Sequence, residues 1–178
     1  MAESAEFVAT VGIDAGGDSC RLCVAKSGQD RVNLHVNRVS NRQTPALVSF
    51  DKRLRIYGEE AEARAASLFK NSVPLPLYIS GLDKDSLGEY IKTKKYLFGS
   101  TFDKNNGAFS VTFDDAPYQV YPAEILSFFV DKVLDTVRKE CEVSTSDGNN
   151  KFRVALSLPI YLSEETKKGI YNSLSLTG

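Results

Sequence analysis

The 178-residue sequence has few of the residues that indicate metal sites, disulfides or a charged binding surface. It contains one histidine and three cysteines, and 22 basic residues nearly balance 23 acidic ones. No long run of either charge predicts a nucleic-acid or membrane patch. No apolar run approaches the ~20 residues that span a bilayer, and acids stand at the start where a secretory signal would carry bases. We therefore expect no nucleic-acid or membrane partner and a cytoplasmic location, with the endoplasmic-reticulum lumen as the alternative.

The cysteines offer no framework of disulfides or metal ligands. Three cysteines cannot all pair with one another, and a chain with 42% hydrophobic residues can bury one core without disulfides. Cys20 and Cys23 have the spacing of a zinc or redox pair, but residues three apart on a strand point to opposite faces. We expect one domain, three reduced thiols and no metal at this pair.

The first part of the chain is patterned for strands. Residues 7–13 are nearly all apolar, which predicts a central strand buried on both faces, and a tight turn follows at 14–17. Polar neighbours alternate with Val32, Leu34 and Val36, so the only histidine, His35, is expected to be exposed. Further strands are predicted at 22–25, 32–36 and 46–50, with the first three strands antiparallel.

Helical spacing enters later. It begins near Gly58, with Ala61, Ala65 and Leu68 on one face, and returns strongly from Pro122, which suits the first turn of a helix. The remaining predictions are a hairpin at 109–121, a polar loop at 144–150, a strand at 153–158 and a last helix capped by Ser163. This order predicts an α/β fold of the ribonuclease-H-like or actin-like kind, a mixed five-stranded sheet with flanking helices.

The turn after the first strand has the composition of a phosphate-binding loop. Asp14 ends the strand, and the small residues Gly16 and Gly17 let backbone amides approach an oxyanion. A carboxylate beside them can hold Mg²⁺, often through water. An ordinary hairpin turn is the competing interpretation of this segment taken alone.

Five segments in the same order resemble the 70-kDa heat-shock chaperone superfamily. The stretch Asn-Arg-Gln-Thr-Pro at 41–45 is similar to the family's Asn-Arg-x-Thr-Pro, and Lys-Tyr-Leu-Phe-Gly at 95–99 to its Lys-Arg-hydrophobic-hydrophobic-Gly. The matching segments are 12–20, 41–50, 57–61, 95–99 and 154–161. Details at 19–20, 24–26 and 49–53 are most similar to the 110-kDa branch.

The resemblance implies the N-terminal lobe of an actin-like ATP-binding domain, with residues 1–178 ending before a second lobe. It implies ATP or ADP with Mg²⁺ as cofactors. By residue, it assigns Asp14 to the water shell of Mg²⁺ and Gly16 and Gly17 to the β- and γ-phosphates. Lys95 would orient the γ-phosphate, so Asp14 and Lys95 are the implied catalytic residues, and Pro159 belongs to the family's nucleotide switch.

The turn also departs from the family. Ordinary members follow the Asp-x-Gly with two threonines and a tyrosine, whereas Gly17, Asp18 and Ser19 stand here. An acid such as Asp18 repels a triphosphate unless a cation or solvent lies between them, so it points away or weakens this half of the phosphate site. We expect a parent protein that is at most a weak ATPase, and no activity from these 178 residues alone.

The resemblance implies a chaperone that acts as a holdase or as a nucleotide-exchange partner of 70-kDa chaperones. Its partners would be unfolded clients, 70-kDa chaperones and co-chaperones. The alternative is an interaction module in which nucleotide is structural or absent, and a nuclease is disfavoured because only Asp14 is placed to hold metal. Without the resemblance, Lys95 would be part of a solvated lysine face and Pro159 would simply end a strand.

Overall fold

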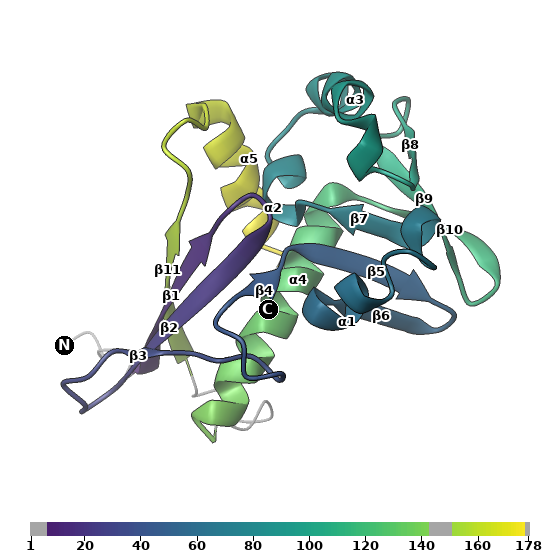
Figure 1. The fold of residues 1–178 in the computed structure, drawn as a ribbon. Helices are drawn as coiled ribbons and strands as arrows, with labels where there is room; N and C mark the ends of the chain where they lie inside the picture. The colour runs from purple at the N-terminus through teal and green to yellow at the C-terminus, as the bar shows by residue number, and fades with distance from the viewer. Residues whose placement is uncertain (1–6, 143–150, 177–178) are drawn as a thin grey trace.

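In the computed structural model, which describes residues 7–142 and 151–176, β1 (Phe7–Ala15) lies at the centre of a mixed sheet (Figure 1). The strand order is β11-β1-β2-β3, and β4 pairs separately with β2. β11 is parallel to β1, and the other pairings are antiparallel. The other four strands are β2 (Ser19–Lys26), β3 (Asn33–Leu34), β4 (Thr44–Pro45) and β11 (Lys151–Ser157). The predicted α/β fold with a mixed five-stranded sheet is confirmed.

Two three-stranded antiparallel sheets were predicted only in part. The predicted strand at 46–50 and the hairpin at 109–121 are present, and the hairpin turn narrows to Asp114 and Asp115, both with positive φ. The second sheet has the order β6-β5-β7, and the third β10-β9-β8. Their strands are β5 (Leu47–Asp51), β6 (Leu54–Tyr57), β7 (Ser72–Pro74), β8 (Thr101–Asp103), β9 (Ala108–Phe113) and β10 (Ala116–Val120).

Helix α4 (Pro122–Glu140) begins and ends close to its predicted positions. The Glu124 carboxylate accepts a hydrogen bond from the Tyr121 amide at 2.9 Å, which satisfies one of the free donors at the helix start. Helix α5 (Glu164–Leu174) is capped as predicted, since Ser163 Oγ accepts from the Thr166 amide at 3.1 Å. None of the helices within residues 7–142 and 151–176 is long and apolar enough to cross a membrane.

The shorter helices depart more from the pattern. Helix α1 (Gly58–Ala63) ends before Ala65 and Leu68, so the longer helix predicted there is wrong. The remaining helical segments were not predicted: α2 (Pro76–Ser80), α3 (Lys84–Thr93) and the 3-10 turns η1 (Phe69–Asn71) and η2 (Lys95–Leu97). The loop predicted at 144–150 lies outside the described residues.

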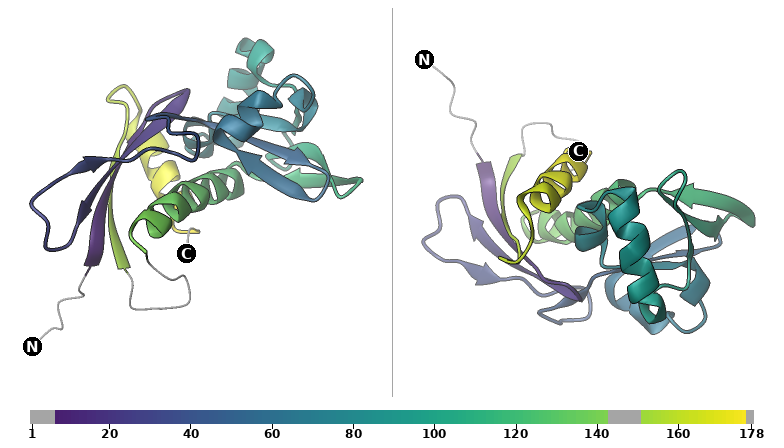
Figure 2. Two further views of the ribbon diagram at one scale, coloured as in Figure 1. Left: turned by 60° about the horizontal axis from the view of Figure 1, so that its bottom comes forward. Right: turned by 90° about the horizontal axis from the view of Figure 1, so that it is seen from above.

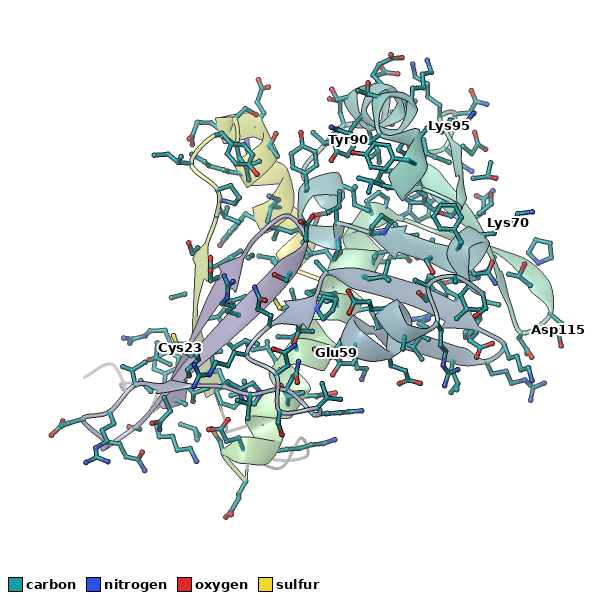
Figure 3. The ribbon with its side chains drawn as sticks, in the orientation of Figure 1. Cys23, Glu59, Lys70, Tyr90, Lys95 and Asp115 are labelled. Atoms are coloured by element: carbon teal, nitrogen blue, oxygen red, sulfur yellow. The ribbon has the colours of Figure 1, made fainter. Side chains whose placement is uncertain are left out.

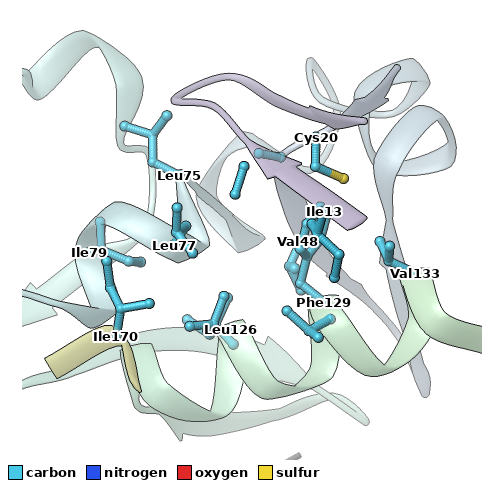
Figure 4. Packing of buried hydrophobic residues seen from close by; sticks show 14 of the residues in the cluster. Ile13, Cys20, Val48, Leu75, Leu77, Ile79, Leu126, Phe129, Val133 and Ile170 are labelled. Carbon is cyan, nitrogen blue, oxygen red and sulfur yellow. The ribbon is translucent and has the colours of Figure 1, made fainter. Parts of the chain in front are cut away.

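One continuous core joins the three sheets. The inner face of α4 supplies seven buried apolar side chains: Ile125, Leu126, Phe129, Val130, Val133, Leu134 and Val137. Figure 4 shows Leu126 and Phe129 packed beside Ile13 of β1 and Val48 of β5. In the left view of Figure 2, α4 and α5 lie on the same side of the β1-β2-β11 sheet. The opposite side of that sheet is not covered by a helix in the described parts of the chain.

The prediction that β1 is buried on both faces is therefore wrong. Val11, Ile13 and Ala15 are buried, but Asp14 is exposed and Gly12 is only partly covered. After Val8, the uncovered face carries the small or polar residues Thr10, Gly12 and Asp14, which the nearly continuous apolar run did not distinguish from a second buried face. This difference leaves the end of β1 accessible from one side.

The alternation around His35 is inverted. His35 is 6% exposed, whereas Val32, Leu34 and Val36 are exposed. The His35 amide still pairs with the Leu22 carbonyl of β2 at 2.9 Å, and it is the polar side of this segment that faces α4. His35 Nε2 lies 2.8 Å from Thr136 Oγ1, and Nδ1 pairs with the Glu140 carboxylate, so α4 provides polar partners for the buried ring.

Candidate functional site

The turn between β1 and β2 is held by backbone hydrogen bonds, one within the turn and one from Ala46. The Gly16 amide donates to the Ser19 carbonyl at 3.0 Å, and the Ala46 amide donates to the Asp18 carbonyl at 2.7 Å. A Cβ at Gly16 would lie 3.0 Å from the Ser19 carbonyl oxygen, whereas one at Gly17 would meet no atom within 4 Å. The Gly17 side of the turn therefore faces open space.

A cavity of about 330 Å³ lies beside this turn, and we call it the turn cavity. Its walls come from the turn, the start of α2, the α3–η2 segment and the residues after β11. The lining residues are Gly16, Gly17, Asp18, Leu75, Leu77, Tyr78, Tyr90, Lys94, Tyr96, Leu97, Pro159, Tyr161 and Leu162. The structure thus brings four predicted site residues to one cavity: Gly16, Gly17, Asp18 and Pro159. Leu75 and Leu77 form an apolar part of its wall and continue into the core (Figure 4).

Lys95 lies close in sequence to this cavity but is not among its lining residues. Lys94 and Tyr96, on either side of it, do line the cavity. In the view of Figure 3, Tyr90 lies on the α5 side of the α3–η2 segment and Lys95 on the β8 side. The assignment of Lys95 to a γ-phosphate stays a prediction, because the cavity walls include its neighbours instead.

Asp14 lies on the uncovered face of the sheet, next to a second, shallow hollow. Arg21 Nη1 is 3.5 Å from Asp14 Oδ2 across the β1–β2 pair, and Gly12, Cys23 and Ser157 line the same hollow. Both partners of this ion pair are at least half exposed, so the pair contributes little to stability and leaves the carboxylate accessible.

This carboxylate suits Mg²⁺ held through water. Within residues 7–142 and 151–176, no three histidine, cysteine, aspartate or glutamate side chains form a group that could hold a metal directly. Mg²⁺ retains several of its waters and accepts one carboxylate in many nucleotide sites. The exposed Asp14 side chain is compatible with that mode and with no dedicated protein cage.

The two cysteines of the Cys-x-x-Cys spacing point to opposite faces, as predicted. Cys20 is buried on the face that packs toward α4, and Cys23 lines the hollow on the other face. Burial raises the pKa of the Cys20 thiol to about 12. Cys20, Cys23 and Cys141 are all unpaired.

Tyrosine side chains are the part of this site that the sequence did not predict. Tyr78, Tyr90, Tyr96 and Tyr161 line the turn cavity. The ring centroids of Tyr78 and Tyr90 lie 4.8 Å apart. These residues come from separate elements, so no spacing in the sequence indicates that they meet.

Comparison with known proteins decides the family. The profile described as Hsp70 protein matches residues 10–178. The chain belongs to the Hsp70 protein family. The family predicted from five short segments is thereby confirmed over nearly the whole chain.

Curated proteins similar to this chain agree with the predicted 110-kDa branch. A heat shock protein homolog of Saccharomyces cerevisiae is 31% identical over 170 residues, which are 94% of this chain and 23% of that protein. A second heat shock protein homolog of the same yeast is 28% identical over 170 residues, and the heat shock protein hsp88 of Neurospora crassa is 26% identical over 173. The chain spans 23% of the length of each of these relatives.

Proposed function

We propose that this Hsp70-family chain is the first lobe of an ATP-binding domain. The complete two-lobed domain would bind Mg-ATP between its lobes. The observation that carries the proposal is the meeting of the Gly16-Gly17 turn with Pro159 at one cavity. Because β1 and β11 are parallel neighbours, the turn after β1 and Pro159 after β11 lie at the same edge of the sheet. Ligands of open α/β sheets commonly bind outside that edge.

Each predicted residue has a place in this proposal. Backbone amides of the Gly16-Gly17 turn would contact the β- and γ-phosphates, and Asp14 would hold hydrated Mg²⁺ from the uncovered face. Mg²⁺ would neutralise charge on the phosphates. Lys95 would reach the γ-phosphate only after the α3–η2 segment shifts or the second lobe closes against it.

Pro159 supports a link between nucleotide and the rest of the molecule. It stands two residues after Ser157, which pairs with Asp14 in the β1–β11 register, and it precedes the capped start of α5. A conformational change at the β1–β2 turn could therefore be passed to α5 through Pro159. We propose that this residue belongs to the nucleotide switch.

We further propose that the complete protein is a cytoplasmic chaperone. It would act as a holdase or as a nucleotide-exchange partner of 70-kDa chaperones, and unfolded clients and co-chaperones would be its other partners. Membership of the Hsp70 family and the heat-shock names of the relatives support a chaperone role. Asp18 beside the phosphate turn favours slow hydrolysis or none.

The test is Mg-ATP binding and single-turnover hydrolysis, measured on these 178 residues and on a chain extended through the second lobe. We expect weak binding and no hydrolysis by the short chain, and clear binding by the longer one. Low-micromolar ATP affinity of residues 1–178 alone would contradict a site divided between two lobes.

A second candidate function is partner binding with nucleotide structural or absent. It is favoured by Asp18 at the turn and by Tyr96 and Tyr161, which remain largely exposed beside it. Lys95→Ala in the full-length protein separates the two candidates. Unchanged client protection and partner binding would favour this second function, whereas loss of both would favour ATP binding.

A further inference from the structure

A second large cavity, of about 620 Å³, lies between helix α4 and the strands β5, β6 and β10, and we call it the α4 cavity. It shares no lining residue with the turn cavity. Three of its lining residues belong to the buried core: Val48, Phe50 and Ile125. Three others keep part of their apolar surface accessible: Tyr118, Phe128 and Leu176. A ligand can therefore make apolar contacts in this cavity without opening the core.

The helix side of the α4 cavity carries two carboxylates. Its lining residues follow one another at spacings of three and four, which place them on one helix face: Glu124, Ser127, Phe128 and Asp131. The Asp131 carboxylate is already paired, since it lies 3.1 Å from Arg138 Nη1 and 3.6 Å from Lys132 Nζ. Within the described ranges of the chain, Glu124 has no basic side chain within 4.0 Å. Glu124 is therefore the carboxylate of this wall that lacks a counter-ion.

The strand side of the α4 cavity carries one cation, Arg55 of β6. Its guanidinium carbon lies 5.4 Å from the ring centroid of Phe113 and 5.8 Å from that of Tyr118. These rings attract the guanidinium and orient it. Among the side chains that the structure describes, no carboxylate lies within 4.0 Å of Arg55. The planar fork of N–H donors is therefore available, and its geometry matches a carboxylate.

One unpaired charge of each sign selects the ligand. A polyanion would be repelled by the carboxylates of Glu124 and Asp131, and a polyamine would be repelled by Arg55. A ligand with one carboxylate and one ammonium group satisfies both walls. Because Arg55 and Glu124 are more than 4.0 Å apart, such a ligand has to extend from one wall to the other. An extended peptide of three residues spans about 10 Å and carries these two charges at its ends.

We propose that the α4 cavity binds a short apolar peptide with free ends. Its carboxylate would accept hydrogen bonds from Arg55, and its ammonium group would pair with Glu124. The apolar side chains of the peptide would contact Phe128 and Leu176. The cavity volume of about 620 Å³ lies within the range of about 300–1,000 Å³ that small-ligand pockets occupy. The site needs no nucleotide and is separate from the ATP proposal.

The probe is the tripeptide Leu-Phe-Leu with both ends free, titrated into the nucleotide-free 178-residue chain and followed by ¹H–¹⁵N NMR. We expect shifts of the backbone amide signals of Arg55, Tyr118 and Ser127 that saturate with peptide. Leu-Phe-Leu-amide lacks the carboxylate and should bind about fivefold more weakly. Acetyl-Leu-Phe-Leu lacks the ammonium group and should bind about threefold more weakly.

Substitutions in the α4 cavity identify which wall holds each end of the peptide. Arg55→Gln should weaken binding of Leu-Phe-Leu about fivefold and leave binding of Leu-Phe-Leu-amide unchanged. Glu124→Gln should weaken binding of Leu-Phe-Leu about threefold and leave binding of acetyl-Leu-Phe-Leu unchanged. Glutamine can still accept the hydrogen bond from the Tyr121 amide, so the start of α4 is kept. The matched controls are Arg53→Gln and Glu89→Gln, outside the cavity, and neither should change the affinity.

Three results would overturn the proposal. The first is that the signals of Arg55, Tyr118 and Ser127 do not move with Leu-Phe-Leu. The second is equal binding of the free and the two capped peptides, which would leave the charges without a role. The third is that Arg55→Gln or Glu124→Gln weakens its capped peptide as much as Leu-Phe-Leu, so that no charge pair is lost. ATP binding by the longer chain is measured separately and is not decided by any of these results.

Discussion

The two faces of the β1-β2-β11 sheet differ in burial: one packs into the core and the other is open to solvent. On one face, Val11, Ile13 and Leu22 are buried toward α4 as part of the continuous core. On the other face, the same strands present Gly12, Asp14 and polar neighbours to an open hollow. Because side chains alternate along a strand, one set holds the fold while the other remains free for ligands. The turn at the end of β1 can therefore contact ligands without loss of core packing.

The largest expected effect lies on the covered face. Phe129→Ala should lower the free energy of unfolding by about 3–5 kcal/mol, because a buried ring that packs edge-on against Tyr57 leaves a cavity. Urea unfolding followed by circular dichroism measures the change. Asp14→Asn on the open face is the matched control and should change stability by less than about 0.5 kcal/mol. Equal losses for the two variants would contradict the division between the faces.

The next effect tests how α4 holds the segment after β3. His35→Ala should lower stability by about 1–3 kcal/mol, since Thr136 and Glu140 lose their buried partner. Val32→Thr, on the exposed side of the same segment, should be nearly neutral. If thermal or urea unfolding placed the larger loss at Val32, the prediction of an exposed histidine would regain support.

At Gly12, on the open face of the sheet, even a methyl side chain is expected to lower stability. A Cβ there would lie 2.6 Å from Cys23 Sγ, so Gly12→Ala should lower stability by about 1–2 kcal/mol. Adding Cys23→Ala should restore most of this loss, which a double-mutant cycle detects. Additive losses in the double variant would mean that the crowding arises elsewhere.

The last prediction compares the two faces without any substitution, through the rates at which the thiols of Cys20 and Cys23 are chemically labelled. The thiolate is the reactive form, and the pKa of Cys20 is raised to about 12, so few Cys20 thiolates exist at pH 8. Raising the pH toward 12 should increase its reactivity. Iodoacetamide with mass spectrometry should label Cys23 at least about tenfold faster than Cys20 at pH 8. Comparable rates in the folded chain would show that Cys20 is accessible.

The strongest periodic signals predicted the fold well. Helix α4, the β1–β2 pair and the β9–β10 hairpin are present at their predicted positions, although only one face of β1 is buried. Short elements such as β7 and α2 carry too few residues for a period to show. His35 was misplaced for a different reason, because the alternation reveals two faces but not which of them α4 covers.

The site was predictable where it lies in one segment and not where separate segments meet. Gly16, Gly17 and Asp18 are adjacent in the chain, and Pro159 follows a strand whose parallel pairing brings it to the same edge. Tyr78 and Tyr161 come to the same cavity only through tertiary packing, which local patterns do not contain. Family resemblance supplied a role for Lys95, while the cavity wall is formed by Lys94 and Tyr96.

The most direct test of a nucleotide-binding turn is amide hydrogen exchange of the chain extended through the second lobe, with and without Mg-ATP. We predict slower exchange at Gly16, Gly17 and Asp18 when nucleotide binds, with unchanged exchange across α4. Saturating Mg-ATP that protects other segments and leaves the turn unchanged would contradict the claim that the β1–β2 turn contacts the nucleotide.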